Sequence, residues 1–410
     1  MGVPIMNKDT SVWMATSLLS VLALHFGPQV STLRGQDRAA PFRIEHSVIL
    51  TSPPDLHFAQ SRAALVPANP PRVLLTTQQI EKAGSHGYRD IFTVETADGA
   101  KTWSPPKRLD SLQRKRMPAG HDFVMGDICP QWHAATGVVL ATGKTFGFDG
   151  GVKENRGHER VSYAIYSPNR NEWSELKLVS LPEFDHEGQK ILEPNSGCHQ
   201  RFDLPSGDIL LPIRYRKDPK SRAYTTIVAR CTFDGENLIY QEHGSELTIP
   251  RERGLYEPSV IGFAGRFFLT MRADHSAFVS HSHDGLHFAP IKEWSFDDGK
   301  VLGNYNSQQH WLVHNDELYL TYTRRGANND HVFRHRAPLF IARVDPNRLC
   351  VFRDSECILM PETGVDLSGG FGILEISPRE TWVISSEMAF PADRREESNR
   401  VLLAKLLWNS

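Results

Sequence analysis

Short apolar segments separated by polar turn residues recur along the chain. Six of them share one form, because each follows a turn and ends in a polar or charged residue. They are residues 72–78, 138–144, 209–214, 267–272, 318–324 and 381–387. Apolar runs of about four to eight residues between turns, with little helical periodicity, are typical of β-strands. The pattern therefore predicts an all-β fold.

The six segments fit one repeating unit of four antiparallel strands, in which each segment is the second strand. A single unit has too little apolar surface for a core of its own, and radial stacking of the units supplies the missing face. The repeat predicts a six-bladed β-propeller that forms a single domain over residues 40–410. We expect an early strand at residues 42–49 to join the short last blade and close the ring. A double β-sandwich and a parallel β-helix are the alternative folds.

An apolar run near the N-terminus has the form of an export signal. It extends over 15 residues, from position 12 to position 26, and Lys8 precedes it. This length suits the hydrophobic region of a signal peptide and is short for a membrane span of about 20 residues. We expect a signal peptide over approximately residues 1–30 and a secreted or periplasmic protein with no membrane span in its mature form. A buried hydrophobic helix is the alternative.

The overall charge argues against one class of partner. The formal net charge of the chain is −2, which does not favour a nucleic-acid groove. A local cluster of arginines would instead suit one small anion. We expect a monomer without a nucleic-acid partner, cofactor or metal.

The five cysteines match no zinc-binding spacing. Cys350 and Cys357 flank a predicted hairpin and could pair across it. For Cys129 and Cys198, a buried small hydrophobic side chain is the default interpretation.

Two predicted turns between third and fourth strands share a local sequence. They lie at residues 96–103 and 282–288, and residues 167–173 form a weaker copy. An aspartate side chain accepts bonds from the turn amides, a glycine takes a positive φ, and an aromatic side chain packs under the hairpin. Together with the repeats, these turns resemble the Asp boxes of the sialidase superfamily. The resemblance covers roughly residues 55–405.

In that superfamily three arginines bind the substrate carboxylate, a glutamate polarises a tyrosine nucleophile, and an aspartate is the acid/base. The resemblance implies that Arg62 is the first arginine and that Arg272 is the second. Arg336 corresponds to the third, with Arg334 as a rival. Glu257, in Tyr-Glu-Pro-Ser-Val, corresponds to the family's glutamate. Planar guanidinium groups bind carboxylates at two points, so several that converge form a strong anion site.

Two positions depart from the family pattern. The tyrosine should precede the second strand of the sixth blade, where Phe371 has no hydroxyl group. The aspartate should follow the second strand of the first blade, where residues 76–79 read Thr-Thr-Gln-Gln. Neither threonine nor glutamine donates a proton usefully near neutral pH.

Other side chains at predicted strand ends could supply the missing chemistry, because a carboxylate pair, or a His or Tyr with a carboxylate, can cleave a sugar bond. The catalytic candidates are Glu257, Asp127, His199 and Tyr322. The further substrate-binding candidates are Arg214 and Arg324. The polar loop at residues 324–336 contains four arginines and is a candidate wall over an anionic sugar.

We therefore expect an exported, exo-acting sialidase-like glycoside hydrolase whose substrate is an acidic, carboxylate-bearing oligosaccharide or polysaccharide. A uronate-directed polysaccharide lyase on the same scaffold is one alternative. A non-catalytic carbohydrate-binding propeller is another, from a different functional class.

Overall fold

The structure is a computed structural model that describes residues 41–52, 57–80, 87–116, 121–149, 153–154, 159–364, 367–388 and 399–409. The chain divides into a unit of residues 1–39 and a unit of residues 40–410, and the described residues belong to the second. The predicted signal peptide lies outside the described residues. Within the described part of the chain, no helix has the length and apolar character needed to cross a membrane.

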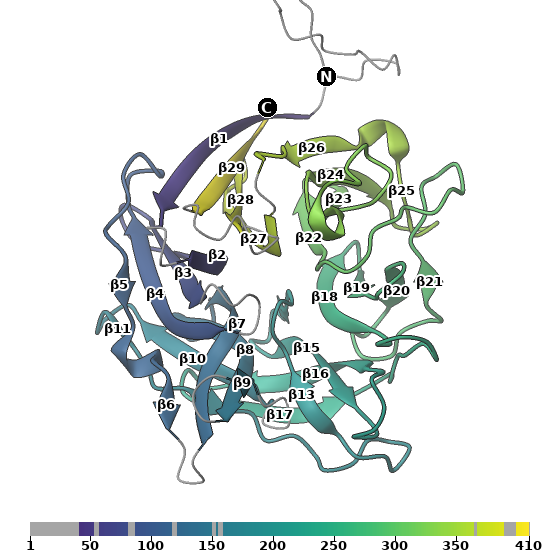
Figure 1. Cartoon of the computed structure of the whole chain (residues 1–410), viewed down its shortest axis with the longest axis horizontal. Coiled ribbons are helices and arrows are strands. Elements are labelled where there is room, and N and C mark those ends of the chain that lie inside the picture. Colours follow the sequence, from purple (N-terminus) through teal and green to yellow (C-terminus); the bar gives the residue numbers. More distant parts are fainter. Residues whose placement is uncertain are drawn as a thin grey trace, which may run out of the picture. The chain divides into compact units, whose positions relative to one another are not determined.

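Six antiparallel sheets follow one another around a ring in chain order and form the blades of a propeller (Figure 1). Each blade starts with an inner strand, and the following strands lie progressively farther from the centre. The all-β, six-bladed fold that the sequence predicts is confirmed, which removes the β-sandwich and the β-helix as alternatives.

The strands of the first three blades have the following bounds. The first blade contains β2 (His57–Val66), β3 (Arg72–Ile80), β4 (Tyr88–Thr96) and β5 (Lys107–Arg108). The second contains β7 (His121–His133), β8 (Val138–Asp149) and β10 (Val161–Ser167), with the short strands β6 (Lys115–Arg116), β9 (Lys153–Glu154), β11 (Glu172–Trp173) and β12 (Lys177–Leu178). The third contains β13 (Leu192–Asn195), β14 (Phe202–Asp203), β15 (Ile209–Arg216), β16 (Thr225–Phe233) and β17 (Leu238–His243).

The remaining blades complete the ring. The fourth contains β18 (Tyr256–Phe263), β19 (Arg266–Arg272), β20 (Phe278–Ser282) and β21 (Lys292–Glu293). The fifth contains β22 (His310–His314), β23 (Glu317–Tyr322), β24 (Leu339–Asp345), β25 (Cys350–Val351) and β26 (Cys357–Met360). The sixth contains β27 (Leu367–Ser377), β28 (Glu380–Glu387), β29 (Arg400–Trp408) and β1 (Phe42–Thr51). Short 3-10 helices are η1 (Asp110–Leu112), η3 (Phe333–His335) and η4 (Arg353–Ser355).

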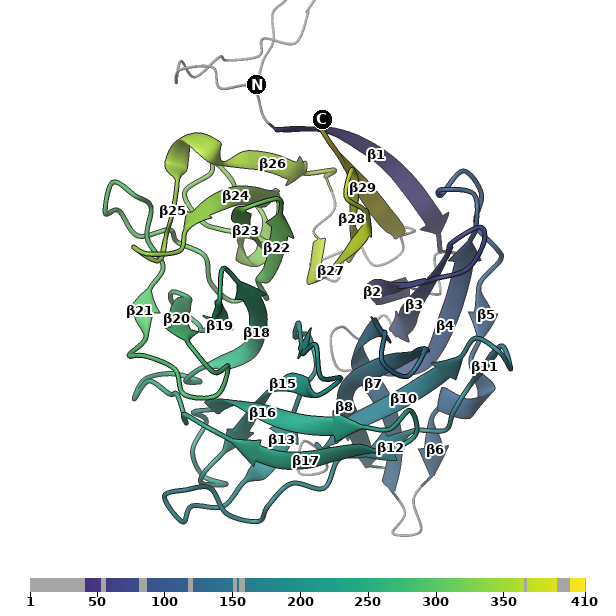
Figure 2. The same ribbon diagram turned by 180° about the vertical axis from the view of Figure 1, so that it is seen from behind.

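β1 closes the ring by joining the outer edge of the sixth blade (Figure 2). It pairs antiparallel with β29, beginning with Phe42 opposite Trp408, so the early strand that the sequence predicts is confirmed. Asn399 links the sixth blade to the first. Its Nδ2 donates to the backbone carbonyl of Phe58 in the first blade and to that of Glu387 in the sixth. Closure covers a strand edge that would otherwise be open to pairing with other chains.

Apolar side chains fill the space between neighbouring blades. Between the fourth and fifth blades, Phe268, Trp294 and Trp311 are fully buried. Burial of a side chain such as Phe268 contributes about 1.5–3 kcal/mol. The indole Nε1 of Trp311 also donates to the carbonyl of Ser259 at 2.8 Å, which links the inner strands β22 and β18.

The turns that resemble Asp boxes have the local geometry that the sequence predicts. Asp98 Oδ1 accepts bonds from the amides of Lys101 and Thr102 at 2.9 and 3.1 Å, and Gly99 has a φ of 73°. Asp284 makes the same kind of contacts in the fourth blade. These turns join third to fourth strands, so they stabilise blades and lie apart from the inner strands.

Each blade has one irregular position on its inner strand or, in the fifth blade, four residues before it. The residue there has a positive φ in every blade: Gln60 (58°), Asp127 (52°), Glu193 (49°), Glu257 (45°), Asn306 (51°) and Gly369 (75°). In blades one to four and in blade six, the pairing register shifts at this residue, which identifies a β-bulge. Bulges re-aim side chains, and a positive φ at a non-glycine residue is strain of the kind found at functional sites. Each blade therefore has one irregular backbone position on or just before its inner strand, and in five of the blades the residue there has a side chain.

Candidate functional site

Glu257 and Arg272 form an ion pair on neighbouring strands of the fourth blade. Glu257 is the bulged residue of β18, and Arg272 is the last residue of β19. Arg272 Nη1 donates to Glu257 Oε2 at 2.5 Å. Burial alone would raise the pKa of Glu257, but the positive charge of Arg272 outweighs burial and holds the pKa below its ordinary value. The structure thus brings two of the predicted site residues together.

Asn306 accepts hydrogen bonds from two guanidinium groups, those of Arg272 and Arg253. Its Oδ1 accepts bonds from Arg272 Nη2 at 2.6 Å and from Arg253 Nη2 at 3.1 Å. Arg253 also donates from Nε to Asp274, whose carboxylate accepts a bond from the Tyr256 hydroxyl at 2.6 Å. Two guanidinium groups that share one acceptor lie close together, and each also has a carboxylate partner, Glu257 for Arg272 and Asp274 for Arg253.

Arg336 lies on the loop before β24 and belongs to the same part of the site as the Glu257–Arg272 ion pair. A Cβ atom added at Gly369 would lie 2.6 Å from Arg336 Nε, so the arginine packs directly on the glycine backbone of β27. Burial, together with the charges of Arg272 and Arg334, lowers the pKa of Arg336 to about 10. The charges of these guanidinium groups therefore repel one another. A bound anion would relieve this repulsion.

Arg62 is buried on β2, and the protein itself engages all of its nitrogens. Nε donates to the Phe371 carbonyl at 3.1 Å, and Nη1 donates to the carbonyls of Ile128 and Gln60 at 3.3 and 3.4 Å. Nη2 donates to the side-chain oxygens of Gln60 and Gln308 at 2.9 and 2.7 Å. A ligand could bind Arg62 only by displacing one of these acceptors.

Asp127 is the bulged residue of β7 and is almost fully buried. Its Oδ2 lies 3.7 Å from Lys144 Nζ, and its Oδ1 makes no hydrogen bond with the described residues. Burial raises the pKa of Asp127; the charges of Lys144 and Arg62 oppose this effect, and that of Glu257 adds to it. The charge of Glu257 therefore acts on Asp127. A raised pKa favours the protonated form of a carboxyl group, which can donate a proton.

Arg214 lies in a buried cluster of charges between the second and third blades. Its Nη2 donates to Glu159 Oε2 at 2.5 Å, and Lys144 Nζ lies 3.3 Å from Glu159 Oε1. Burial would raise the pKa of Glu159, but Arg214 and Lys144 lower it to about 2. Because Lys144 also contacts Asp127, this cluster forms one wall of the central site.

Tyr322 and Arg324 contact a different carboxylate. The Tyr322 hydroxyl donates to Glu356 Oε1 at 2.6 Å, and Arg324 donates to both oxygens of Glu356 at 2.7 and 2.6 Å. Tyr322 is fully buried in the apolar core between the fourth and fifth blades. Burial raises its pKa well above the ordinary value, which makes it a poor nucleophile. The structure does not join these two residues to the Glu257 ion pair.

His199 borders a small cavity of about 50 Å³ whose lining also includes Arg62, Cys129 and His310. Its Nε2 lies 3.0 Å from Thr142 Oγ1. Burial lowers the pKa of His199 well below its ordinary value, so the ring is neutral near pH 7. This volume corresponds to about two water molecules and is too small for a sugar ring.

All five cysteines are free thiols. The suggested pairing of Cys350 with Cys357 is wrong, because the two strands that carry them pair with different parts of β24. Cys350 lies opposite Asp345, whereas Cys357 lies opposite Ile341. Cys198 is buried, with Sγ 3.6 Å from Gln60 Oε1, so it lies at the edge of the central site.

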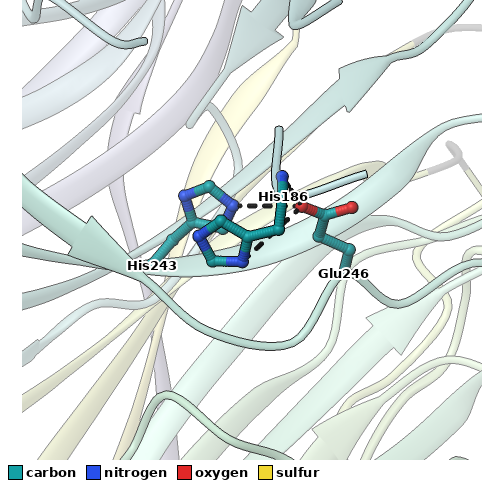
Figure 3. A group of neighbouring side chains, drawn as sticks. All are labelled: His186, His243 and Glu246. Carbon is teal, nitrogen blue, oxygen red and sulfur yellow. Dashed lines mark hydrogen bonds and ion pairs between the residues drawn. The ribbon is translucent and has the colours of Figure 1, made fainter. Parts of the chain in front are cut away.

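Potential metal ligands gather elsewhere, on the third blade (Figure 3). His243 Nε2 and His186 Nδ1 lie 3.3 and 3.9 Å from Glu246 Oε1. The imidazole rings stack in parallel with centroids 4.1 Å apart, so their lone pairs do not converge on one point. The ammonium group of Lys217 lies 2.9 Å from Glu246 Oε2 and 3.0 Å from Asp185 Oδ2, where its charge would oppose a metal ion. We assign this cluster a structural role.

Sequence reasoning did not single out Asn306, Arg253 or Asp274. One signal for Asn306 is present, because Tyr305-Asn306 in the fifth blade repeats Tyr256-Glu257 in the fourth. Residues at equivalent positions of a repeat face the same way, so Asn306 could have been placed beside Glu257.

Comparisons with known proteins bear on the fold. No protein-family model matches the chain, and no curated protein matches its sequence. A protein of unknown function from Dyadobacter fermentans superposes with a TM-score of 0.63 at 15% identity, over 89% of this chain and 99% of that chain. The sialidase of Trypanosoma rangeli superposes with a TM-score of 0.58 at 12% identity, over 85% of this chain and 55% of that chain.

The NanB sialidase of Streptococcus pneumoniae gives a TM-score of 0.57 at 12% identity, over 90% of this chain and 70% of that chain. The propeller is sialidase-like. At these identities the likeness concerns the fold alone, and the chain spans only about half the length of the T. rangeli enzyme.

Proposed function

We propose that the protein is an exported sialidase-like glycoside hydrolase that acts on a glycan bearing a carboxylate. The observation that carries the proposal is the convergence of Arg272 and Arg336 beside the bulged Glu257. A substrate carboxylate bound there would turn the repulsion between the guanidinium groups into attraction. The apolar run at residues 12–26 supports export.

Asp127 is the proposed acid. Its proton passes to the glycosidic oxygen, and the bond between that oxygen and the anomeric carbon breaks. The Glu257 carboxylate stabilises the positive charge that develops on the ring. Water then adds to the anomeric carbon and returns a proton to Asp127. This route requires no hydroxyl group at Phe371.

A carbohydrate-binding propeller without activity is the second candidate. Two observations favour it. The nitrogens of Arg62 are occupied by protein acceptors, and Phe371 is buried, with its ring centroid 4.9 Å from that of His310 in an edge-to-face contact. Such a protein would keep the anion site and lack turnover.

Incubation of the protein with a panel of acidic oligosaccharides in oxygen-labelled water distinguishes these functions. A hydrolase gives a new reducing end that carries the label, and Asp127→Asn lowers the rate of its formation by about 10²- to 10⁴-fold. The matched control is Arg230→Ala, because Arg230 lies on the outside of the third blade in ion pairs with Asp208 and Glu242. An unsaturated product would indicate a lyase, and binding without any product would support the second candidate.

A further inference from the structure

We propose that Glu159 is a positioning residue for the proposed acid, Asp127. It acts through two neighbours, Lys144 and Asn195, which contact its two carboxylate oxygens. The inference rests on the proposed function and deepens it, because it names the side chain that sets how readily the acid releases its proton. Glu159 affects the reaction only through these neighbours.

Acidic and basic side chains alternate in a buried row that consists of Asp127, Lys144, Glu159 and Arg214. Lys144 Nζ lies 3.7 Å from Asp127 Oδ2 and 3.3 Å from Glu159 Oε1. Arg214 Nη2 donates to Glu159 Oε2 at 2.5 Å. Each of the four residues is at most 9% exposed, so water and salt screen their charges far less than at the surface. A change of charge at Glu159 therefore acts on Asp127.

Backbone pairing holds Lys144 between the two carboxyl groups. In the register of β7 and β8, Lys144 lies opposite the residue that directly precedes the bulged Asp127. On the other side, the amide of Arg160 donates to Thr145 Oγ1 at 2.9 Å, and the amide of Thr145 donates to the Arg160 carbonyl at 3.0 Å. These bonds join the neighbours of Glu159 and Lys144 in the chain, so the two side chains are fixed next to each other.

Asn195 forms the second connection between Glu159 and the acid. Its Nδ2 donates to Glu159 Oε2 at 3.4 Å, and its Oδ1 accepts a bond from the amide of Gly197 at 2.6 Å. A Cβ atom added at Gly197 would lie 2.5 Å from Asp127 Cβ. The amide of the next residue, Cys198, donates to the Asp127 carbonyl at 3.2 Å. Glu159 thus holds Asn195, and Asn195 holds the turn that packs on the bulge of β7.

The charge of Glu159 opposes that of Lys144 at the acid. The charged and titratable groups that face Asp127 are Lys144 on β8, Arg62 on β2, Glu257 on β18, Cys129 on β7 and Cys198 before β14. The positive charges among them favour the ionised carboxylate, whereas burial and Glu257 favour the protonated form. Glu159 offsets part of the attraction that Lys144 exerts on Asp127. Without the charge of Glu159, Asp127 would lose its proton at a lower pH.

Magnetic-resonance titration of isotope-labelled aspartate carboxyl carbons tests the proposal without knowledge of the sugar. The signal of Asp127 is the one that is absent from Asp127→Asn. Glu159→Gln should lower the pH at which this signal titrates by about one pH unit or more, and Lys144→Met should raise it by a similar amount. Opposite shifts from one cluster separate an effect of charge from a loss of packing. Glu356→Gln is the matched control, because it removes a carboxylate that binds an arginine on the fifth blade, and it should leave the titration unchanged.

The outcomes separate this proposal from the proposed function. If Asp127 titrates in Glu159→Gln as it does in the wild-type protein, or if both variants shift it in the same direction, the positioning role is overturned and the hydrolase proposal stands. If Glu159→Gln does not fold, Lys144→Met decides, and an unchanged titration overturns the role. If the titration shifts as expected but no glycan gives a labelled reducing end, the link to Asp127 holds and the hydrolase proposal fails. With a hydrolysed glycan, kcat/KM should fall at a lower pH in Glu159→Gln than in the wild-type protein.

Discussion

Glu257 orients Arg272, because the carboxylate on the bulge of β18 accepts a bond from Nη1 at 2.5 Å across the strand pair. Asn306 takes Nη2 on the other side. The Nε of Arg272 is buried and makes no hydrogen bond with the described residues. A guanidinium fixed at two nitrogens loses little freedom when it binds an anion, which favours affinity.

Arg272→Lys should weaken the binding of monocarboxylates by about tenfold or more, although the charge is retained. A lysine ammonium cannot reproduce the planar fork that bonds Glu257, Asn306 and a ligand together. Titration with propionate measures the effect. Arg230→Lys makes the same chemical change at the outer surface and should leave binding unaltered; equal affinities in both variants would argue against the arrangement.

Gly369→Ala should reduce anion binding by displacing Arg336. The new methyl group would lie 2.6 Å from Arg336 Nε at a φ of 75°. Gly265→Ala is the matched control, because Gly265 has the same φ and nothing lies within 4 Å of the added atom. Both substitutions should cost about 1–2 kcal/mol of stability from the backbone strain. Only Gly369→Ala should also lose anion affinity, and unchanged affinity would contradict the placement of Arg336.

Asp127→Asn should stabilise the fold at neutral pH. Burial raises the folded-state pKa of Asp127 above its unfolded value of about 3.9, so the ionised form destabilises the folded protein. This penalty is present above the folded-state pKa and disappears below the unfolded pKa. Denaturant unfolding at neutral and acidic pH measures it. A stability gain that is the same at both pH values would show that the carboxyl charge is not its cause.

Since Asp127 is the proposed acid, kcat/KM should change with pH in the sense opposite to that expected for a general base. Because the proton on Asp127 is the reactive species, kcat/KM should fall as pH rises through the raised pKa. Asp127→Asn should lower kcat by about 10²- to 10⁴-fold. A pH–rate profile on any hydrolysed substrate provides the measurement. A rate that rises through that pKa would assign Asp127 to the role of a base.

Glu159→Gln should destabilise the protein at neutral pH by about 3 kcal/mol. Arg214 and Lys144 hold the folded-state pKa of Glu159 at about 2, below its unfolded value of about 4.3. The stabilisation is complete above the unfolded pKa and is lost as pH falls toward 2. Unfolding curves for both proteins should therefore converge on acidification. Parallel curves would show that Glu159 is not ionised in its cluster.

The sequence pattern was sufficient to predict the second strands and the ring closure by β1, because apolar runs between turns are visible without knowledge of side-chain contacts. The resemblance also assigned Glu257 and Arg272 to one site, and the structure pairs them. The pattern did not predict that acceptors on β2, β7 and β27, together with Gln308 just before β22, occupy the nitrogens of Arg62. Nor did it predict that Tyr322 turns into the core toward Glu356. Side-chain direction at a strand end depends on bulges and on neighbouring blades, which strand periodicity does not specify.

Glycan binding by the wild-type protein and by Arg272→Ala tests the central anion site most directly. We predict that an acidic-glycan array identifies at least one ligand of the wild-type protein and that the carboxyl-reduced form of this ligand does not bind. Arg272→Ala should lose the ligand while a circular-dichroism spectrum confirms its fold. If Arg272→Ala binds every acidic glycan as the wild-type protein does, the anion site is not where we place it.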